Sequence, residues 1–471
     1  MAHIVVTAMP FAGHVRPMTA LAAALLARGH RVDAYTGARY ADAFAELGCE
    51  IIPWREAQDF DEHRLSETFP ETDRPGVRGM LAMLRDVFIG TAMGQVADLR
   101  AANSRERFDV LVGDVMTVGA GIAAEMLNKP WVTVSLVPLT LPSRDLPPVG
   151  FALQPPTGWL DRVRDRVLRA AMPVASAPIE RAYRSVREQL DLGPGLPFAE
   201  ALYSPQLVIA TGSPSLEYPR SDLPETVRFV GRLEPAQKPF ATPLWVETLI
   251  DEPRPVVFVT QGTLDTDPRE LLLPTLEGLA DLPVRVVGTT SGRRVGHGYP
   301  SNARLADFLQ YPSILPHAAV GVTNGGWGGV LAMLEQGLPL VVAGGAHDKP
   351  EIAARVAWAG AGLDLRTGHP TPARVAAAVR LLLREPAYRE RAALIGDELR
   401  GLGGATRAAE LVEQFTCHSG LHLLPPSALP PSQVPAPASP STPATPPSPP
   451  TPSSAFTQEV RQLSDTTHSA T

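Results

Sequence analysis

The apolar positions repeat one pattern twice along the chain: a short apolar run, then a longer stretch with apolar residues at helical spacing. Short apolar runs predict buried strands, and helical stretches between them predict the crossovers that a parallel sheet requires. The predicted strands of the first half are residues 3–8, 31–35, 108–115 and 207–210. Those of the second half are residues 256–260, 284–288, 320–323 and 338–343. The pattern therefore predicts an α/β protein with two parallel-sheet domains.

A proline-rich and charged stretch, residues 213–239, separates the two rounds and predicts an interdomain linker. Residues 1–212 then form an N-terminal domain, and residues 240–415, including the last helices, a C-terminal domain. Residues 416–471 are predicted to be a disordered tail, because their Pro, Ser and Thr side chains cannot bury enough surface to offset the loss of entropy. A proline-rich docking segment is the alternative for this tail.

Composition narrows the class of function. The 471 residues have a formal net charge of −7 and no long Lys/Arg block, so nucleic acid is not an expected partner. The two cysteines, Cys49 and Cys417, lie far apart, which indicates a reducing compartment and argues against a cysteine-based zinc site. The N-terminus lacks the features of a signal peptide, and no segment reaches the roughly 18 apolar residues of a membrane span. We expect a cytoplasmic protein.

A glycine-rich turn follows the predicted strand 320–323 and precedes a predicted helix, 327–336. Free N–H groups at a helix N-terminus bind phosphate oxygens, and glycines let those oxygens approach the backbone. The candidate diphosphate-binding residues are Asn324, Gly325, Gly326, Trp327, Gly328 and Gly329. Their spacing fits neither a Walker A loop nor a dinucleotide fingerprint. A tight turn that serves only close packing of helix and strand is the alternative.

A second strand-to-helix turn carries Gly262 and Thr263, whose backbone amides and hydroxyl also suit a phosphate. The carboxylates that follow, Asp265 and Asp267, suggest a metal site at first sight. Asp267 is followed by Pro268 and then Glu270, however, which is typical of a helix N-cap with its reciprocal glutamate. We favour capping, and because no His/Asp/Glu cluster has ligand spacing, we expect no metal site.

His14 lies between the first predicted strand and its helix, at the carboxyl edge where open α/β sheets bind ligands. Asp114 ends a later strand, 108–115, of the same predicted sheet. A carboxylate beside an imidazole fixes its tautomer and favours its charged form, which suits a general base. A surface or capping histidine and a turn aspartate are the alternatives.

These pieces form an ordered set: Gly13-His14 with Pro17, then Asp114, the segment 213–217 and the glycine-rich turn. The set resembles the glycosyltransferases of the UDP-glucuronosyl/glucosyltransferase and macrolide glycosyltransferase group, over about residues 1–415. The resemblance implies the GT-B fold, in which two Rossmann-like domains face each other across a cleft. It implies an acceptor in the N-terminal half and a nucleotide-sugar in the C-terminal half. By the same resemblance His14 deprotonates the acceptor, Asp114 orients it, and the reaction inverts configuration without a metal or cofactor.

The sequence departs from the family pattern at four places. Phe308 replaces the tryptophan that stacks on the base, so UDP and dTDP are not distinguished. Asn324 replaces the phosphate-binding histidine, and Ala332 replaces the glutamate that holds the ribose, a contact that Glu335 could supply one turn on. The Asp-Gln pair that reads the sugar is Asp348-Lys349 here, so the sugar can differ from glucose; a solvent-facing lysine is the alternative.

We predict an inverting glycosyltransferase that moves a hexose or deoxyhexose from a nucleotide diphosphate to a hydroxyl of a lipophilic small molecule. The less regular stretches 60–93 and 139–197 are expected to line the acceptor cleft. Arginines beside apolar positions in 161–189 are typical of a solvated helix face, with peripheral membrane contact as the alternative. A noncatalytic nucleotide-sugar-binding or partner-activating protein is the runner-up, suggested by Asn324, Ala332 and Lys349. An epimerase would need carboxylates near the sugar beyond Asp348.

Overall fold

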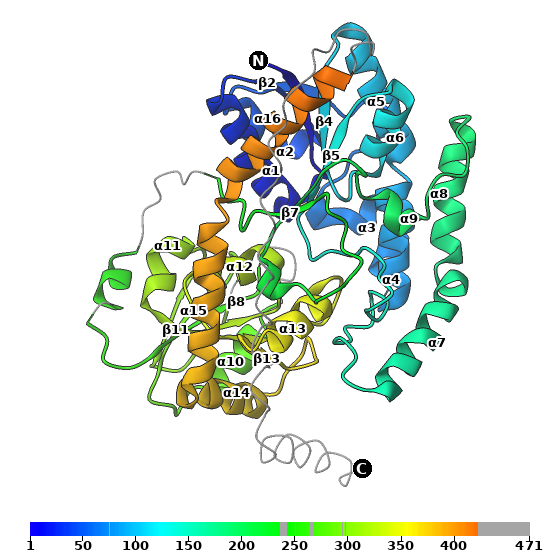
Figure 1. Ribbon diagram of the computed structural model, residues 1–471. Helices are drawn as coiled ribbons and strands as arrows, with labels where there is room; N and C mark the ends of the chain where they lie inside the picture. Colours follow the sequence, from blue (N-terminus) through cyan, green and yellow to red (C-terminus); the bar gives the residue numbers. More distant parts are fainter. Residues whose placement is uncertain are drawn as a thin grey trace, which may run out of the picture.

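The chain folds into two parallel-sheet domains, each with helices on both faces of its sheet (Figure 1). The computed structural model describes residues 1–74, 76–235, 243–249, 251–262, 267–293, 295–296 and 298–422, with side chains to 417. The predicted α/β class with two parallel sheets is confirmed. The predicted tail falls outside the described residues from 423 onward.

The N-terminal sheet has seven strands in the order β3-β2-β1-β4-β5-β6-β7, every neighbouring pair parallel. Its strands are β1 (His3–Thr7), β2 (Arg31–Thr36), β3 (Glu50–Pro53), β4 (Val110–Asp114), β5 (Trp131–Ser135), β6 (Val208–Ala210) and β7 (Val227–Phe229). Its helices are α1 (Ala12–Ala27), α2 (Ala38–Ala45), α3 (Leu65–Thr68), α4 (Val77–Ala82), α5 (Ala92–Arg105), α6 (Val118–Leu127), α7 (Trp159–Ala175), α8 (Ala177–Gln189) and α9 (Phe198–Ala201).

The C-terminal sheet has six strands in the order β10-β9-β8-β11-β12-β13, again all parallel. Its strands are β8 (Val256–Thr260), β9 (Arg285–Thr289), β10 (Ala303–Ala306), β11 (Ala318–Thr323), β12 (Leu340–Val342) and β13 (Gly362–Asp364). The helices that follow along the chain are α10 (Leu272–Gly278), α11 (Tyr311–Ile314), α12 (Trp327–Glu335), α13 (Lys349–Trp358), α14 (Pro372–Arg384), α15 (Pro386–Gly401) and α16 (Gly404–His422).

Both sheets reverse their strand order at one point, between β1 and β4 in the first and between β8 and β11 in the second. At such a switch point the two crossover helices leave the sheet on opposite sides, which opens a crevice at the carboxyl ends of the strands. Each domain therefore offers one ligand-binding crevice, and its floor is set by the two neighbouring strands.

The sequence pattern missed five strands, β3, β5, β7, β10 and β13. Four of these, β3, β7, β10 and β13, have only three or four residues and lie at the edges of their sheets, so their apolar runs are short. The loop predicted before the first helix was also too long. The helix α1 begins at Ala12, with Pro17 inside it, so His14 lies in the first helical turn and not in a loop.

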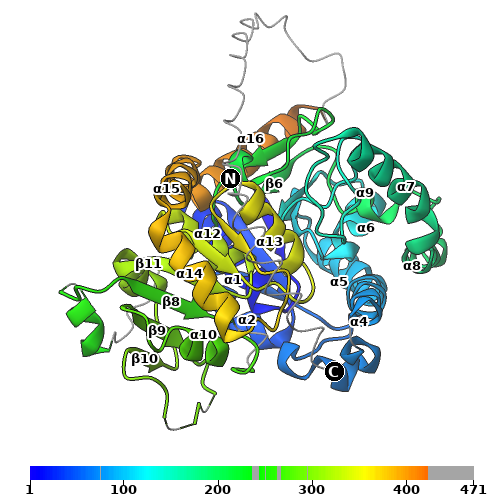
Figure 2. The ribbon, with the colours of Figure 1, turned by 90° about the horizontal axis from the view of Figure 1, so that it is seen from below.

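The two predicted insertions contain helices. Residues 60–93 fold into short helical segments that include α3 and α4, while residues 139–197 hold a long loop and the helices α7 and α8. Figure 1 and Figure 2 show α7 and α8 following one another end to end on the outside of the N-terminal domain, apart from both sheets.

The last helix returns to the N-terminal domain, which differs from the assignment of residues 240–415 to the C-terminal one. The helix α15 packs on the C-terminal core through Ile395 and Leu399, but α16 packs against β1 and α1 of the first sheet. The crossing is pinned where the amide of Gly404 donates to the carbonyl of Val230 at 2.7 Å. Since α16 runs to His422, it also replaces the first residues of the predicted tail.

The contact of α16 with the first sheet leads to a stability prediction. Val412 is fully buried in the cluster that contains Ile4 and Leu25. Replacing Val412 by Ala should lower the free energy of unfolding by about 1–3 kcal/mol, through lost apolar burial and a cavity. Urea unfolding measures this change, with the exposed Thr406→Ala on the same helix as the control. Equal stability of the two variants would contradict the assigned packing.

Candidate active site

The parallel pairing of β1 with β4 brings His14 and Asp114 together. Thr7 of β1 lies opposite Gly113 of β4, so both strands end at the same level. Asp114 is the last residue of β4, and His14 lies in the first turn of α1, the helix that follows β1. Their side chains meet, with His14 Nδ1 at 2.7 Å from Asp114 Oδ2.

Asp114 is held on three sides by hydrogen bonds. Its Oδ2 accepts from the amide of Met9 at 3.1 Å as well as from the imidazole, and its Oδ1 accepts from the amide of Met116 at 3.1 Å. Its side chain is completely buried, whereas 16% of the His14 side chain is exposed. The carboxylate therefore fixes the ring, and the other nitrogen, Nε2, is on the side away from Asp114.

The surroundings of His14 favour its charged form. Burial by itself lowers the pKa of the imidazole, but the attraction and hydrogen bond of Asp114 outweigh it, with smaller contributions from Asp348 and Glu62. The pKa of His14 is therefore raised above its ordinary value. An imidazole in this setting takes up a proton more readily than a free histidine does.

A buried glutamate that the sequence did not single out supports the same helix. Glu62 accepts the amide of Ala12, the first residue of α1, at 3.1 Å, and also the hydroxyl of Tyr40. A carboxylate at a helix N-terminus meets unpaired N–H groups and the positive end of the helix dipole. Glu62 thus anchors the turn that carries His14, but a separation of 50 residues hid the contact from local patterns.

In the second domain, β8 and β11 are paired at Thr260 and Thr323, so the turns after them lie side by side. Across this junction the side-chain amide of Asn324 donates to the carbonyl of Gln261. Gly262 adopts a positive φ of 75° and lines the cavity described below. Thr263, Asp265 and Thr266 lie outside the described residues.

The glycine-rich turn leaves the backbone open at the start of α12. Gly325 has a φ of 93°, which favours glycine, and Gly326 is the N-cap. A Cβ on Gly326 or Gly328 would have no atom within 4 Å, while one on Gly329 would meet the Tyr311 hydroxyl at 3.1 Å. The first amides of this helix have no intrahelical acceptor, so the turn presents N–H groups without side chains in front of them.

The side chain of Trp327 has a role that the sequence did not indicate. Its indole is buried and donates from Nε1 to Thr211 of the other domain at 3.0 Å. A Cβ on Gly212 would come within 2.7 Å of the same ring. Trp327 therefore ties the two domains together, and only its backbone belongs to the open helix start.

The other donor-side candidates are placed as follows. Phe308 lies on the loop between β10 and α11 with 56% of its surface exposed. Tyr311, which the sequence analysis did not single out, comes from the following helix and lines the cavity. Ala332 is buried. Glu335, the alternative ribose-binding residue, is already paired with Arg232 of the linker at 2.7 Å.

Asp348 and Lys349 form the turn that opens α13. Both are cavity residues, and His347 before them has a positive φ of 56°. Burial raises the pKa of Asp348, and burial lowers the pKa of Lys349 to about 8. Lys349 packs on the glycine-rich turn, because a Cβ on Gly325 would lie 3.4 Å from its own Cβ.

The predicted cap at Asp267 is only partly right. Asp267 accepts the amide of Arg269 at 2.9 Å, but it closes a turn and α10 begins later, at Leu272. The side chain of Gln261 takes the capping role, since its Oε1 accepts the amide of Leu272 at 3.0 Å. Gln261 therefore links the first turn of the donor side to the helix behind it.

One cavity of about 1690 Å³ joins the two sides of the site. His14 and Asp348 both line it, from opposite domains. Asp348 helps to raise the pKa of His14, and His14 opposes the rise that burial causes in the pKa of Asp348. The rest of the wall is largely apolar and comes from α4, the loop after β5, α7 and α8. No helix within the described part of the chain is long and apolar enough to cross a membrane.

The geometry defines a class of protein. Two Rossmann-like sheets direct their switch points at one cavity, with a histidine–aspartate pair on one wall and an open glycine-rich helix start on the other. This is the GT-B arrangement of glycosyltransferases. The C-terminal domain of the erythromycin biosynthesis protein CIII-like family matches residues 275–413.

Similarity to known proteins establishes the family of this chain. The chain is 38% identical to 4'-demethylrebeccamycin synthase of Lentzea aerocolonigenes, over 88% of this chain and 99% of that protein. It is 31% identical to UDP-glucosyltransferase B1 of Starmerella bombicola, over 84% of this chain and 94% of that protein. The solved glycosyltransferase of kitacinnamycin superposes with a TM-score of 0.69 at 27% identity, covering 88% and 99% of the two chains. The chain belongs to this family of GT-B glycosyltransferases.

The titration of Lys349 can be tested through nucleotide binding. A charged lysine attracts a diphosphate, so the affinity for UDP or dTDP should fall as the pH rises through about 8, where the free enzyme loses this charge. Over that range we expect a loss of roughly tenfold, the scale of one charge-assisted hydrogen bond. Isothermal titration between pH 6.5 and 9.5 measures it, with Lys349→Met as the comparison. A pH dependence that survives unchanged in Lys349→Met would contradict this role.

Proposed function

We propose that this enzyme transfers a hexose or deoxyhexose from a nucleotide diphosphate to a hydroxyl of a lipophilic small molecule, with inversion at the anomeric carbon and without a metal. The observation that carries the proposal is the contact of 2.7 Å between His14 and the buried Asp114, at the wall of a cavity shared by both domains. The names of the relatives, a rebeccamycin-type synthase and a UDP-glucosyltransferase, support a nucleotide-sugar donor.

His14 acts as the general base. Its Nε2 takes the proton of the acceptor hydroxyl while the oxygen attacks the anomeric carbon from the face opposite the diphosphate. The bond between that carbon and the diphosphate oxygen breaks, and the nucleotide diphosphate leaves with the electron pair. Asp114 holds the correct tautomer and balances the imidazolium as it forms, which is the usual role of a buried carboxylate behind a catalytic histidine.

The leaving diphosphate gains charge at the start of α12. Free amides at a helix N-terminus stabilise that charge without reorganising, because they are already oriented. The backbone and Cβ of Lys349 pack against the same turn, and its ammonium would add a cation near the diphosphate. These groups replace the positive charge that the family histidine would supply at Asn324.

Removing the base should separate catalysis from donor binding. We expect His14→Ala to lower kcat by about 10²–10⁴-fold, the usual contribution of a general base, with the Kd of UDP and dTDP unchanged. The assay is release of nucleotide diphosphate from a panel of UDP- and dTDP-sugars with phenolic acceptors. His3→Ala is the matched control, since His3 pairs with Asp33 at 2.8 Å at the opposite end of the same sheet. Retained turnover in His14→Ala would favour the noncatalytic alternative.

The pair also sets the pH dependence. The base works in its neutral form, so the rate rises with pH through the pKa of His14, which Asp114 holds high. In Asp114→Asn that attraction is lost while burial remains, so the acidic limb of kcat/KM should move to lower pH and the plateau should fall. A limb that stays in place would show that another group is titrating.

The acceptor wall favours a lipophilic molecule delivered from a lipid surface. The outer face of α7 exposes Trp159, Leu160, Val163, Val167 and Val174, and Trp159 is 71% exposed. The exposed Arg162 and Arg166 lie along one flank of this stripe. An apolar stripe with a tryptophan and flanking arginines suits the surface of an anionic bilayer, and the inner face of the same helix lines the cavity.

Vesicle flotation tests this contact. The enzyme should bind vesicles that contain phosphatidylglycerol more strongly than vesicles of phosphatidylcholine, and Val163→Glu/Val167→Glu should reduce binding at least about tenfold. Thr406→Glu/Cys417→Glu adds the same charge on exposed positions of α16 and serves as the control. If the wild type does not bind vesicles, the face is exposed to solvent. If the α7 substitutions instead break a dimer, the face contacts a second copy of the chain.

A further inference from the structure

Glu351 connects the donor turn to the acceptor wall. It lies in the first turn of α13, two residues after Lys349, and its side chain is 11% exposed. Its Oε1 accepts the amides of Gly150 at 2.7 Å and of Ala152 at 2.9 Å, both from the N-terminal domain. The two partners lie about 200 residues away in the sequence, so this contact exists only when the domains are together.

The loop is shaped to make this contact. Gly150 and Ala152 have positive φ values of 103° and 51°, which direct alternate amides toward one side of the loop. Ala152 is not a glycine, and a left-handed alanine costs about 1–2 kcal/mol that a bond to a carboxylate offsets. The same loop supplies Pro148, Val149 and Phe151 to the cavity.

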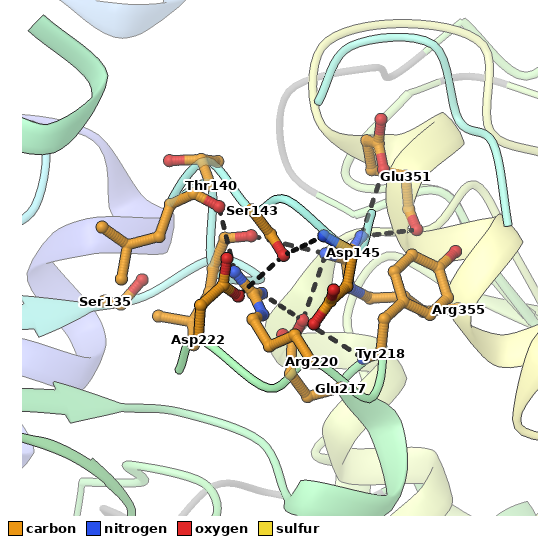
Figure 3. A network of polar contacts seen from close by, with 12 residues as sticks. Ser135, Thr140, Ser143, Asp145, Glu217, Tyr218, Arg220, Asp222, Glu351 and Arg355 are labelled. Atoms are coloured by element: carbon orange, nitrogen blue, oxygen red, sulfur yellow. Dashed lines mark hydrogen bonds and ion pairs between the residues drawn. The ribbon is translucent and has the colours of Figure 1, made fainter. Parts of the chain in front are cut away.

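A network of buried charged side chains fixes the other carboxylate oxygen of Glu351. Its Oε2 accepts Arg355 Nη1 at 3.1 Å, and the guanidinium of Arg355 lies 4.5 Å from the ring of Tyr218. Arg355 also faces Glu217 at 3.7 Å, and Glu217 pairs with Arg220 at 2.6 Å (Figure 3). This network reaches the segment after β6, so the carboxylate is fixed against both domains.

We propose that Glu351 is a positioning residue that couples the two substrate sites: donor binding at Asp348–Lys349 steadies α13, and Glu351 passes this to the loop 148–152. The loop then closes the acceptor wall. The inference rests on the proposed function for the meaning of the two sites, but the coupling itself is measured without turnover. This coupling accounts for the hydrogen bonds between a carboxylate of the donor domain and two backbone amides of the acceptor domain.

Amide hydrogen exchange of a peptide spanning 146–154 tests the coupling. In the wild type, saturating UDP or dTDP should slow exchange of this peptide. In Glu351→Ala the peptide should exchange roughly ten- to hundredfold faster, the equilibrium equivalent of losing one hydrogen bond to a charged group, and should no longer respond to nucleotide. Glu390→Ala, an exposed glutamate on α15, is the matched control.

Two further measurements make the result decisive. The Kd of UDP and dTDP should rise in Glu351→Ala by no more than the factor by which nucleotide slows loop exchange in the wild type, because coupling is reciprocal. The affinity of Nile red for the apolar cavity should fall and lose its dependence on nucleotide. Loop exchange that still responds to nucleotide in Glu351→Ala would overturn the proposal. So would a parallel loss of nucleotide and Nile red binding, which indicates general loosening. Neither readout depends on sugar transfer, so an inactive enzyme would overturn the proposed function alone.

Discussion

The constraint on which the site depends is the parallel pairing of the central strands, β1 with β4 and β8 with β11. Because parallel strands in register end at one level, each pair fixes two turns beside each other without any contact between the turns themselves. The first pair places His14 against Asp114, and the second places Gly262 and Gln261 against Asn324. A slip of one residue in either pair would turn the side chains to the other face and separate these groups.

The chemistry of the site follows from burial at these edges. Asp114 loses its solvent but gains three donors, so its charge is satisfied where an isolated buried carboxylate would not be. Burial destabilises the charged form of Lys349 relative to a lysine in water, so its pKa falls to about 8. The acceptor side therefore stabilises a proton on a histidine, while the donor side keeps a cation that gains stability when an anion arrives.

The sequence predicted what depends on local patterns. The alternation of strands and helices, the ends of the central strands and the glycine-rich turn all appear within windows of about ten residues. Contacts between distant segments left no such signal. Glu62 anchors an amide 50 residues away, and Glu351 anchors amides about 200 residues away, so nothing near either glutamate indicated its partner. The destination of α16 was missed for the same reason, because its apolar face suits either sheet.

The return of α16 to the first sheet means that the backbone passes between the domains twice. The two passages are adjacent, since the amide of Gly404 in the second is hydrogen-bonded to Val230 in the first. The two domains are therefore linked covalently twice at one place, and elsewhere they meet only through noncovalent contacts. Any separation of the two cleft walls must therefore keep these two chain passages together, while noncovalent contacts such as the hydrogen bond of Trp327 to Thr211 break.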